Sequence, residues 1–259
     1  MTAGSLDGKV ALVTGAARDR GIGRGIALVL AERGADVAIA DRSHDDEAGR
    51  RLEEIDALGR RAAFIQLDVA EPGENERLVA EVADRLGRLD VFVPNAGVAL
   101  WQSLVDVERA DWDFIMRVNL HGLLYGCRAA AAQMRRQGQG GAIVATSSVH
   151  AVATGPPLGV YGASKHAVAY LVGVMAREWG EDGISVNHVG PGWVDTNIND
   201  ASPDFVDDES RERIRASIPY RGRPADPREI GEAVAYLAAS TYTTGAYIRV
   251  DGGLMVGKY

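Results

Sequence analysis

Cysteine, lysine and long apolar runs are scarce in this chain of 259 residues. Its single cysteine, Cys127, cannot form an intrachain disulfide, which is typical of a reducing compartment, and the apolar run around it predicts a buried thiol. No apolar stretch approaches the roughly 20 residues that span a bilayer, so we expect no membrane insertion. The opening residues lack the basic start and long apolar core of a secretory signal, so we expect a cytoplasmic protein.

Positive charge is also in short supply, with 28 lysines and arginines against 36 aspartates and glutamates and a net charge of −8. This balance argues against a surface-wide attraction to nucleic acid, and the short basic runs alternate with acids as on solvated helix faces. The five histidines have no metal-ligand spacing, so we expect no bound metal. A small-molecule substrate is the expected partner, rather than nucleic acid or a membrane.

Short β-branched or apolar runs alternate with longer amphipathic stretches along the chain. This alternation predicts a parallel sheet with helices on both faces, and seven strands suffice for a single doubly wound, Rossmann-type α/β domain over residues 1–259. We expect strands at residues 10–13, 36–40, 62–66, 91–93, 142–146, 184–189 and 246–250. We expect helices near residues 24–33, 45–58, 74–86, 111–136, 161–181 and 227–239.

One long segment, residues 193–223, breaks the alternation and is polar and acidic in its middle. Irregular segments of that length inside compact domains are usually functional, so we expect a substrate lid. Tyr220, Arg221 and Arg223 are its expected polar contacts with the substrate.

A glycine-rich turn follows the first expected strand, where Gly15 and Gly21-Ile22-Gly23 lead into a helix. Glycines in such a turn let the backbone approach a pyrophosphate, and the free amides and positive dipole of the helix N-terminus receive its charge. The second strand ends at Asp41, about 20 residues further on, where a carboxylate can accept hydrogen bonds from the adenosine ribose hydroxyls. These features predict a dinucleotide cofactor.

The choice between NAD and NADP depends on the charges around Asp41. Its carboxylate would repel a 2′-phosphate, which favours NAD. Arg20 and Arg42 argue for NADP, because guanidinium groups can pair bidentately with a phosphate. We expect NAD to be preferred, with NADP as the alternative.

Ser148, Tyr161 and Lys165 follow the fifth expected strand, at the edge where open α/β sheets bind ligands. A spacing of four places Tyr161 and Lys165 on one helix face, and a nearby ammonium lowers the pKa of a phenol from its usual value of about 10. Tyr161 would then exchange a proton with an alcohol or ketone, while the Ser148 hydroxyl orients the substrate oxygen. By itself, a tyrosine and a lysine at this spacing occur by chance in many helices.

The ordered set of motifs resembles the short-chain dehydrogenase/reductase family over essentially the full chain. It comprises Thr14-Gly15 with Gly21-Ile22-Gly23, Asp68-Val69, Asn95-Ala96-Gly97, Val118-Asn119-Leu120, Ser148, Tyr161-x-x-x-Lys165, Pro191-Gly192 and Val250-Asp251-Gly252-Gly253. The resemblance implies that Asn119 completes a catalytic tetrad with Ser148, Tyr161 and Lys165 through a water-linked proton relay.

The resemblance also implies a wider set of cofactor contacts, in which Val194 and Thr196 hold the nicotinamide carboxamide. With the residues argued above, the expected cofactor-binding set is Gly15, Arg20, Gly21, Ile22, Gly23, Asp41, Arg42, Asp68, Val69, Asn95, Ala96, Gly97, Tyr161, Lys165, Pro191, Gly192, Val194 and Thr196.

Two departures from the family pattern concern the phosphate turn and the fourth strand. Five residues, 16–20, separate Thr14-Gly15 from Gly21, where the family usually has three. The enoyl-thioester reductase branch has a similarly long turn, but it usually places its tyrosine and lysine farther apart, so we keep alcohol and carbonyl chemistry. Pro94 replaces the usual asparagine before Asn95, which is sterically acceptable at a strand end.

The expected substrate contacts are Ser148, His150, Tyr161 and Trp193. The expected reaction is hydride transfer between a nicotinamide cofactor and a secondary alcohol or ketone, with a sugar or another hydroxylated small molecule favoured. A 3-oxoacyl-thioester reductase using NADPH and a catalytically silent dinucleotide-binding sensor are the alternatives. The resemblance further implies a homotetramer, built through helices 111–136 and 161–181 and the carboxyl-terminal segment.

Overall fold

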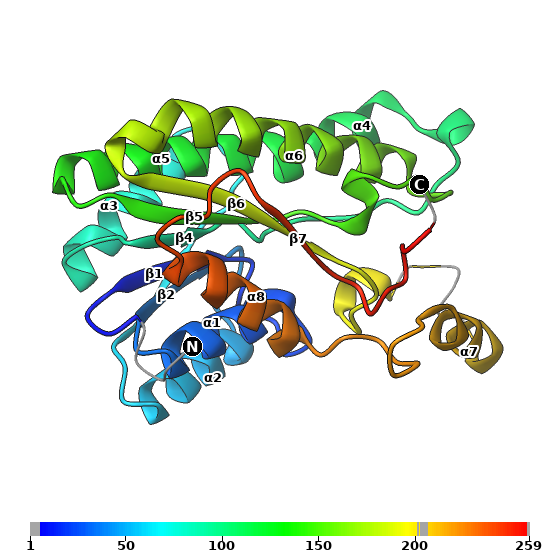
Figure 1. The fold of residues 1–259 in the computed structure, drawn as a ribbon, viewed down its shortest axis with the longest axis horizontal. Coiled ribbons are helices and arrows are strands. Elements are labelled where there is room, and N and C mark those ends of the chain that lie inside the picture. Colours follow the sequence, from blue (N-terminus) through cyan, green and yellow to red (C-terminus); the bar gives the residue numbers. More distant parts are fainter. Residues whose placement is uncertain (1–5, 201, 203–206, 258–259) are drawn as a thin grey trace.

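Seven parallel strands form one sheet, which confirms the predicted α/β architecture (Figure 1). The computed structural model describes residues 6–200, 202 and 207–257. The strand order is β3-β2-β1-β4-β5-β6-β7, so the order reverses between β1 and β4. The strands are β1 (Val10–Thr14), β2 (Asp36–Asp41), β3 (Ala62–Gln66), β4 (Val91–Val93), β5 (Gly141–Thr146), β6 (Ile184–Pro191) and β7 (Tyr247–Val250).

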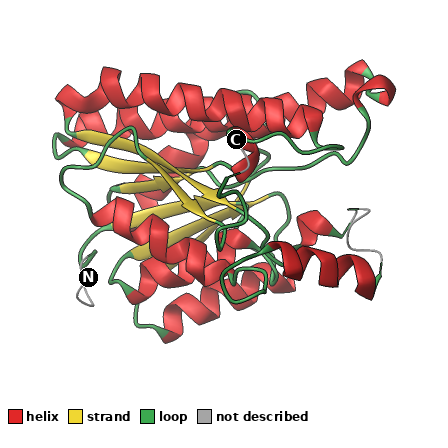
Figure 2. Cartoon of the chain, turned by 45° about the vertical axis from the view of Figure 1, so that its right-hand side comes forward, coloured by secondary structure: helices red, strands yellow, loops and turns green. Residues whose placement is uncertain are grey.

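Helices cover both faces of the sheet (Figures 1 and 2). One face packs against α1 (Ile22–Glu32), α2 (Asp46–Ala57) and α8 (Pro227–Ala239). The opposite face packs against α3 (Glu74–Leu86), α5 (Leu123–Gln137) and α6 (Gly159–Trp179), with α4 (Arg109–Met116) before α5. Cys127 is fully buried in this second layer, as expected.

Local sequence explains where several helices begin. The side chain of Asp45 accepts hydrogen bonds from the amides of Glu47 and Ala48 and starts α2. Asp226 and Glu229 form a reciprocal capping box around Pro227, the first residue of α8. The helices α3 and α8 keep the bounds that the apolar periodicity predicts.

Two regions differ from the sequence expectation. The predicted helix 111–136 is three segments, because a π-helical turn, Arg117–Gly122, separates α4 from α5. The segment expected to be irregular contains α7 (Asp208–Ser217), which the Asp207 side chain caps through the Ser210 amide. This helix carries few apolar residues, so it has almost no hydrophobic periodicity to reveal it. It lies beyond the carboxyl ends of the strands (Figure 1).

Within the described ranges, no helix is both long enough and apolar enough to cross a membrane. The same part of the chain has no group of three or more histidine, cysteine, aspartate or glutamate side chains arranged to hold a metal ion.

Helices α1 and α8 cross where Gly25 of α1 meets Gly231 of α8. The contact between the two helices is therefore sensitive to the addition of a single methyl group. A Cβ added at Gly25 would lie 2.4 Å from the carbonyl carbon of Pro227. We expect Gly25→Ala to lower the free energy of unfolding by about 1 to 3 kcal/mol, because overpacking forces the two backbones apart.

Thermal melting tests this prediction with Gly49→Ala as the matched control. Gly49 lies in α2 and a Cβ there would meet nothing within 4 Å, so alanine should raise stability by up to about 1 kcal/mol. Equal melting temperatures for the two variants would contradict the close crossing at Gly25.

Candidate active site

A cavity of about 1170 Å³ opens at the carboxyl ends of the strands. Open α/β sheets bind ligands at this edge, where the strand order reverses and the flanking loops diverge. The cavity brings together most of the residues predicted from sequence: Gly15, Gly21, Ile22, Asp41, Arg42, Asp68, Val69, Asn95, Ala96, Gly97, Ser148, His150, Tyr161, Lys165, Pro191, Gly192, Trp193, Val194 and Thr196. Arg20, Gly23 and Asn119 do not line it.

The phosphate turn is shaped by its glycines. Gly15 has a φ of 65°, and a Cβ there would lie 2.9 Å from the Cα of Ala96. Gly23 packs under the turn, because its Cβ would come within 2.3 Å of the Gly15 carbonyl oxygen. Gly21 caps α1 without a side-chain hydrogen bond, so the backbone amides of the first turn and the helix dipole are available to a phosphate.

Asp41 organises the turn as well as facing the cavity. Its carboxylate accepts hydrogen bonds from the amide of Ala17 at 3.1 Å and from the amide of Arg42 at 2.8 Å. The Arg42 residue is exposed at the cavity rim. The acid and the arginine on which the choice between NAD and NADP was expected to depend therefore both lie at this end of the cavity.

Arg20 is placed differently from the sequence expectation. It forms ion pairs with Asp195 at 2.7 Å and Asp200 at 3.1 Å, which holds it against the segment after β6 and away from the cavity wall. Arg18 lines the cavity instead and binds Asp45 and Glu47. No sequence motif marks Arg18, because its place depends on how the five-residue turn folds over α2.

Lys165 joins α6 to the end of β5. Its ammonium donates to the carbonyl of Thr146 at 3.0 Å, and the Ser147 hydroxyl donates to the Lys165 carbonyl at 3.3 Å. The ammonium lies 5.7 Å from the centre of the Tyr161 ring, as a spacing of four on one helix predicts. Lys165 is only 4% exposed, so a cation is held inside the protein.

Burial governs the acid–base properties of this pair. It lowers the pKa of Lys165 to about 8. Burial also raises the pKa of Tyr161, while a hydrogen bond with Ser148 opposes that rise. The lower phenol pKa expected beside the ammonium is therefore not found, because burial raises the pKa of Tyr161.

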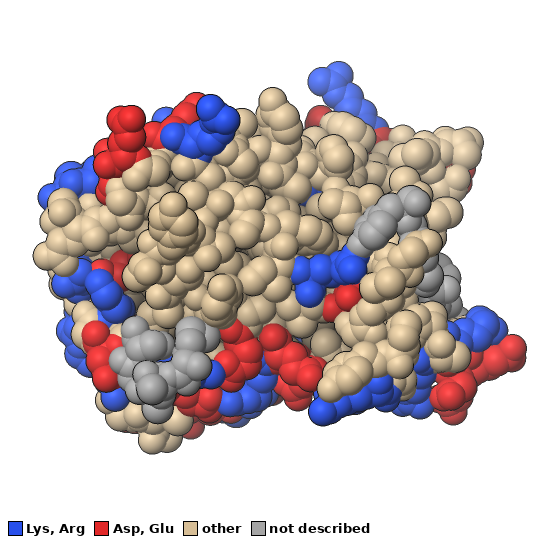
Figure 3. All heavy atoms as spheres, viewed as in Figure 1, with Lys and Arg blue, Asp and Glu red and all other residues tan. Residues whose placement is uncertain are grey.

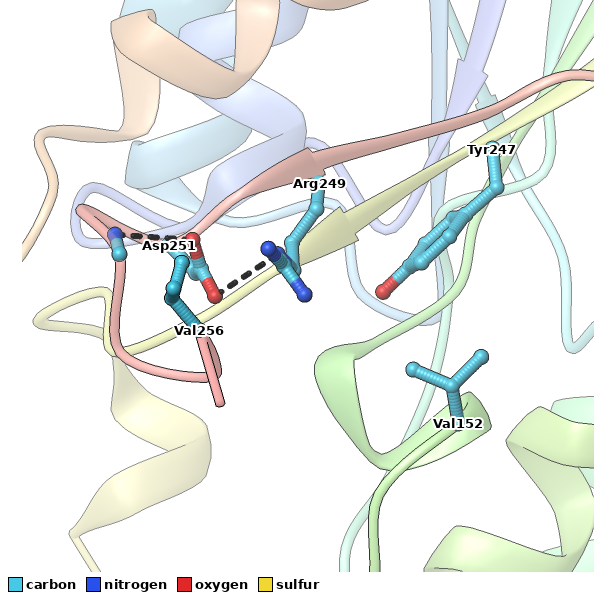
Figure 4. Close-up of a pocket in the computed structure, with 6 residues that line it drawn as sticks. Val152, Tyr247, Arg249, Asp251 and Val256 are labelled. Carbon is cyan, nitrogen blue, oxygen red and sulfur yellow. Dashed lines mark hydrogen bonds and ion pairs between the residues drawn. The ribbon is translucent and has the colours of Figure 1, made fainter. Parts of the chain in front are cut away.

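Ser148 is held from two sides at the end of β5. Its hydroxyl accepts the amide hydrogen of His150 at 3.1 Å, and its carbonyl accepts the Tyr247 hydroxyl at 3.2 Å. Tyr247 comes from the edge strand β7 and reaches toward Val152 across a second cavity of about 680 Å³, where Arg249 pairs with Asp251 (Figure 4).

Sequence reasoning missed Tyr247, although one signal was present. A Cβ at Gly190 would lie 2.1 Å from the Tyr247 hydroxyl oxygen, so a glycine at that position of β6 makes room for the ring. Tyr247 and Ser148 lie 99 residues apart in the sequence, so no local motif indicates their hydrogen bond.

Asn119 lies on the π-helical turn, buried beneath the cavity wall. Its amide oxygen accepts the Val98 amide hydrogen at 2.8 Å, and its amide nitrogen donates to the Val98 carbonyl and to the Ser164 hydroxyl. A Cβ at Gly97 would lie 3.4 Å from both the Asn119 oxygen and the Lys165 ammonium. The side chain of Asn119 therefore fixes the loop that separates it from Lys165.

Aromatic rings and a histidine form the wall near Tyr161. Trp101 and Trp193 stack with ring centres 6.3 Å apart, and the Trp101 indole donates to the Ile198 carbonyl at 3.5 Å. His150 lies edge-on to Tyr161, with ring centres 6.2 Å apart. Burial lowers the pKa of His150, which favours the neutral imidazole.

The polar lid contacts expected from sequence were wrong. Arg223 pairs with Glu229 at the start of α8, and Arg221 lies over the ring of Tyr220, and none of the three lines the cavity. Before α7 the segment contributes Asn197, Ile198 and Asn199 instead, and from α7 it contributes Ser210, Arg213, Ile214 and Ser217. Their helical spacing could have indicated a shared face, had the segment been taken as a helix.

The cleft fits a nicotinamide dinucleotide. Thr146 and Thr196 line it, and each has a buried hydroxyl oxygen with no hydrogen-bond partner in the described structure. Buried polar atoms of this kind are normally satisfied, so two of them in one cleft point to a polar ligand group there. Thr196 is one of the two residues that the family resemblance assigns to the nicotinamide carboxamide, and it lines this cleft.

Fold and site together define a dinucleotide-dependent oxidoreductase of the Rossmann type. A sequence model for a family described as enoyl-(acyl carrier protein) reductase matches residues 15–255. The L-rhamnose 1-dehydrogenase (NAD(P)(+)) of Sphingomonas sp. (strain SKA58) is 40% identical over 253 residues, which cover 97% of this chain and 98% of that protein. The chain belongs to the short-chain dehydrogenase/reductase family.

Other relatives are similar to a comparable degree. A 3-oxoacyl-[acyl-carrier-protein] reductase FabG of Staphylococcus aureus (strain MW2) is 38% identical over 248 residues, covering 95% of this chain and 98% of the relative. The crystal structure of a short-chain type dehydrogenase/reductase from Mycobacterium marinum superposes with a TM-score of 0.90 at 35% identity, covering 97% of each chain. Relatives with similar sequence identity to this chain are thus named for different substrates, so identity alone does not select the substrate.

Asp41 makes a testable prediction about cofactor choice. We expect Asp41→Ala to lower the ratio of kcat/KM for NAD to kcat/KM for NADP by about tenfold, because it removes a charge that repels a 2′-phosphate and an acceptor for the ribose. Steady-state kinetics with both cofactors measure the ratio. Asp46→Ala, an exposed acid nearby, is the control, and an unchanged ratio in Asp41→Ala would refute the assignment.

The buried charge of Lys165 makes a prediction about stability. Below pH 8 the lysine is charged in both the folded and unfolded chain, so its burial costs up to about 3 kcal/mol relative to an uncharged side chain. The cost disappears as the pH rises from about 8, its folded pKa, to 10.5, its unperturbed value.

Lys165→Met should therefore melt at a higher temperature than the unmodified protein at pH 7. The difference should shrink as the pH rises through this window, which thermal melts at several pH values would show. The hydrogen bond to Thr146 is absent from the variant at every pH, whereas the cost of the buried charge is lost across this window, so the slope reports the titration of Lys165. A difference that stays constant with pH would contradict the lowered pKa.

Proposed function

We propose that the protein oxidises a secondary alcohol of a hydroxylated small molecule, with NAD as the preferred cofactor. The observation that carries this proposal is the buried Lys165 ammonium beside Tyr161, in a cleft that also presents Ser148 and the phosphate turn. A buried cation next to a phenol is costly, and such arrangements are concentrated at catalytic sites.

The residues around Tyr161 divide the work of proton transfer. Ser148 binds the substrate oxygen, and Tyr161 accepts its proton as the carbon–oxygen double bond forms. Bound NAD supplies a positively charged nicotinamide ring whose C4 accepts the hydride. The ammonium of Lys165 would favour the phenolate and hold the nicotinamide ribose, while Thr196 and Val194 would orient the carboxamide.

Asn119 supports the proton path by fixing the loop at Val98, and with Lys165 it borders the space beside Gly97. A water in that space would connect Lys165 to solvent and complete the relay. The contacts of its side chain amide support a positioning role for Asn119.

Cofactor preference follows from the adenosine end of the cleft. Asp41 favours NAD, and the exposed Arg42 allows NADP at lower efficiency. The printed name of the Sphingomonas relative includes both cofactors, which supports a site that discriminates only partly.

Two alternatives remain in view. A 3-oxoacyl-thioester reductase uses the same residues in the opposite direction, and the Staphylococcus relative carries that name. The hydroxyl, histidine and arginine side chains at the substrate end favour a polyhydroxylated substrate over an acyl chain. A silent dinucleotide sensor would have no use for the buried Lys165 beside Tyr161, and the cost of that burial argues against it.

The segment from Trp193 through α7 is the proposed substrate lid.

A homotetramer is the proposed assembly. The middle of the face seen in Figure 3 is mostly uncharged, apart from blue and red side chains right of its centre. Tyr170 of α6 and Tyr242 after α8 are highly exposed aromatic residues, at 74% and 101%. Apolar exposure of this kind is typical of surfaces that pack against a partner.

Tyr161→Phe tests the proposed function directly. We expect turnover to fall by about 100- to 10,000-fold, because the variant loses the proton acceptor, while NADH binding measured by fluorescence titration survives. Tyr170→Phe, an exposed tyrosine on the same helix, is the matched control. Normal turnover in Tyr161→Phe would refute the mechanism.

A further inference from the structure

Helix α7 presents one face to the substrate end of the cavity. Ser210, Arg213, Ile214 and Ser217 all line the cavity, and offsets of three, four and seven place them on one side of a helix. Ile214 is buried in an apolar cluster with Val149, the residue that follows Ser148. The helix is therefore docked beside the proposed catalytic serine.

Charge is distributed unevenly along the cavity. Among the described lining residues the carboxylates are Asp41, the last residue of β2, and Asp68, just after β3, both at the expected adenosine end. Among the described lining residues from Val149 to Leu158 and on α7, Arg213 carries the one charged side chain, while Lys165 on α6 belongs to the proposed catalytic group. A cation that faces a ligand cavity without a carboxylate beside it in the wall is suited to an anionic group of the ligand.

One of the two partners of the Arg213 guanidinium can be replaced by a ligand. One nitrogen donates to the Ser210 hydroxyl at 2.7 Å, which fixes the side chain along α7. Another pairs with Glu209 at 3.1 Å, but the Glu209 side chain is 85% exposed. Exposed ion pairs within one helix are worth little, so a ligand oxyanion can take the place of Glu209.

We infer that the substrate is a sugar acid, and that Arg213 binds its carboxylate while Ser148 and Tyr161 hold the reacting hydroxyl. The hydroxyls of Ser210 and Ser217 flank Arg213 on the same face and suit the hydroxyl groups of the substrate. The inference rests on the proposed oxidation of a secondary alcohol and names the class of molecule oxidised.

The experiment compares Arg213→Gln and Arg213→Lys with Arg215→Gln in the full-length protein. Arg215 lies on the same helix, does not line the cavity and pairs with Glu212 at 3.4 Å, so it is the matched control. The substrates are aldonic acids, the corresponding aldoses and alditols, and sugar phosphates, each with NAD. Reduced-cofactor absorbance gives kcat and KM for each.

We expect the unmodified protein to prefer the aldonic acids. Arg213→Gln should raise KM for them by about 10- to 100-fold with little change in kcat, because the contact lies away from the reacting carbon. Its kcat/KM for neutral polyols and its KM for NAD should not change. Arg213→Lys should restore part of the loss, and Arg215→Gln should behave like the unmodified protein.

Failure of the inference and failure of the proposed function give different results. Oxidation of neutral polyols or sugar phosphates in preference to aldonic acids, or an equal effect of Arg213→Gln on acids and polyols, would overturn the sugar-acid assignment alone. No turnover of any compound would count against the proposed function. In that case, calorimetric binding of an aldonic acid to the NADH complex decides the inference, which fails if Arg213→Gln binds as tightly as the unmodified protein.

Discussion

The hydrogen bond from the Lys165 ammonium to the Thr146 carbonyl joins the helix that carries Tyr161 to the strand that leads to Ser148. The return bond from Ser147 to the Lys165 carbonyl makes the junction reciprocal. Because the ammonium is buried, its position is set by these partners rather than by water. Tyr247 binds the carbonyl of Ser148 just after the same strand, and a Cβ at Gly97, in the loop that Asn119 holds, would lie 3.4 Å from the ammonium.

Sequence reasoning worked best where burial dictates residue type. Strands β3 and β4 and helices α3 and α8 have the predicted bounds, because apolar periodicity and capping residues mark them. The π-helical turn at Asn119 was missed, since its extra residue per turn leaves no local pattern. Helix α7 was missed because its residues are mostly charged, and only the fold shows that Ile214 is buried.

Among the site residues, those in sequence motifs could be predicted, whereas the positions of Arg18, Arg20 and Arg213 could not. Motifs located the cavity wall, because Asp41 and Ser148 lie at the ends of strands that the sequence reveals and Tyr161 lies on the helix that follows. The roles of arginines depended on tertiary contacts that no motif encodes. Arg20 is bound to Asp195 and Asp200, whereas Arg18 and Arg213 line the cavity. Placement of long flexible cations is decided by where the carboxylates around them fall in space.

The central claim is that a hydride leaves the alcohol carbon of the substrate for the nicotinamide while Tyr161 takes the proton. The most direct measurement uses a sugar acid or polyol deuterated at the reacting carbon, with the reduced cofactor analysed by NMR. The account predicts deuterium at C4 of the nicotinamide and a slower reaction than with the unlabelled compound. Product formation without deuterium at that carbon would contradict it.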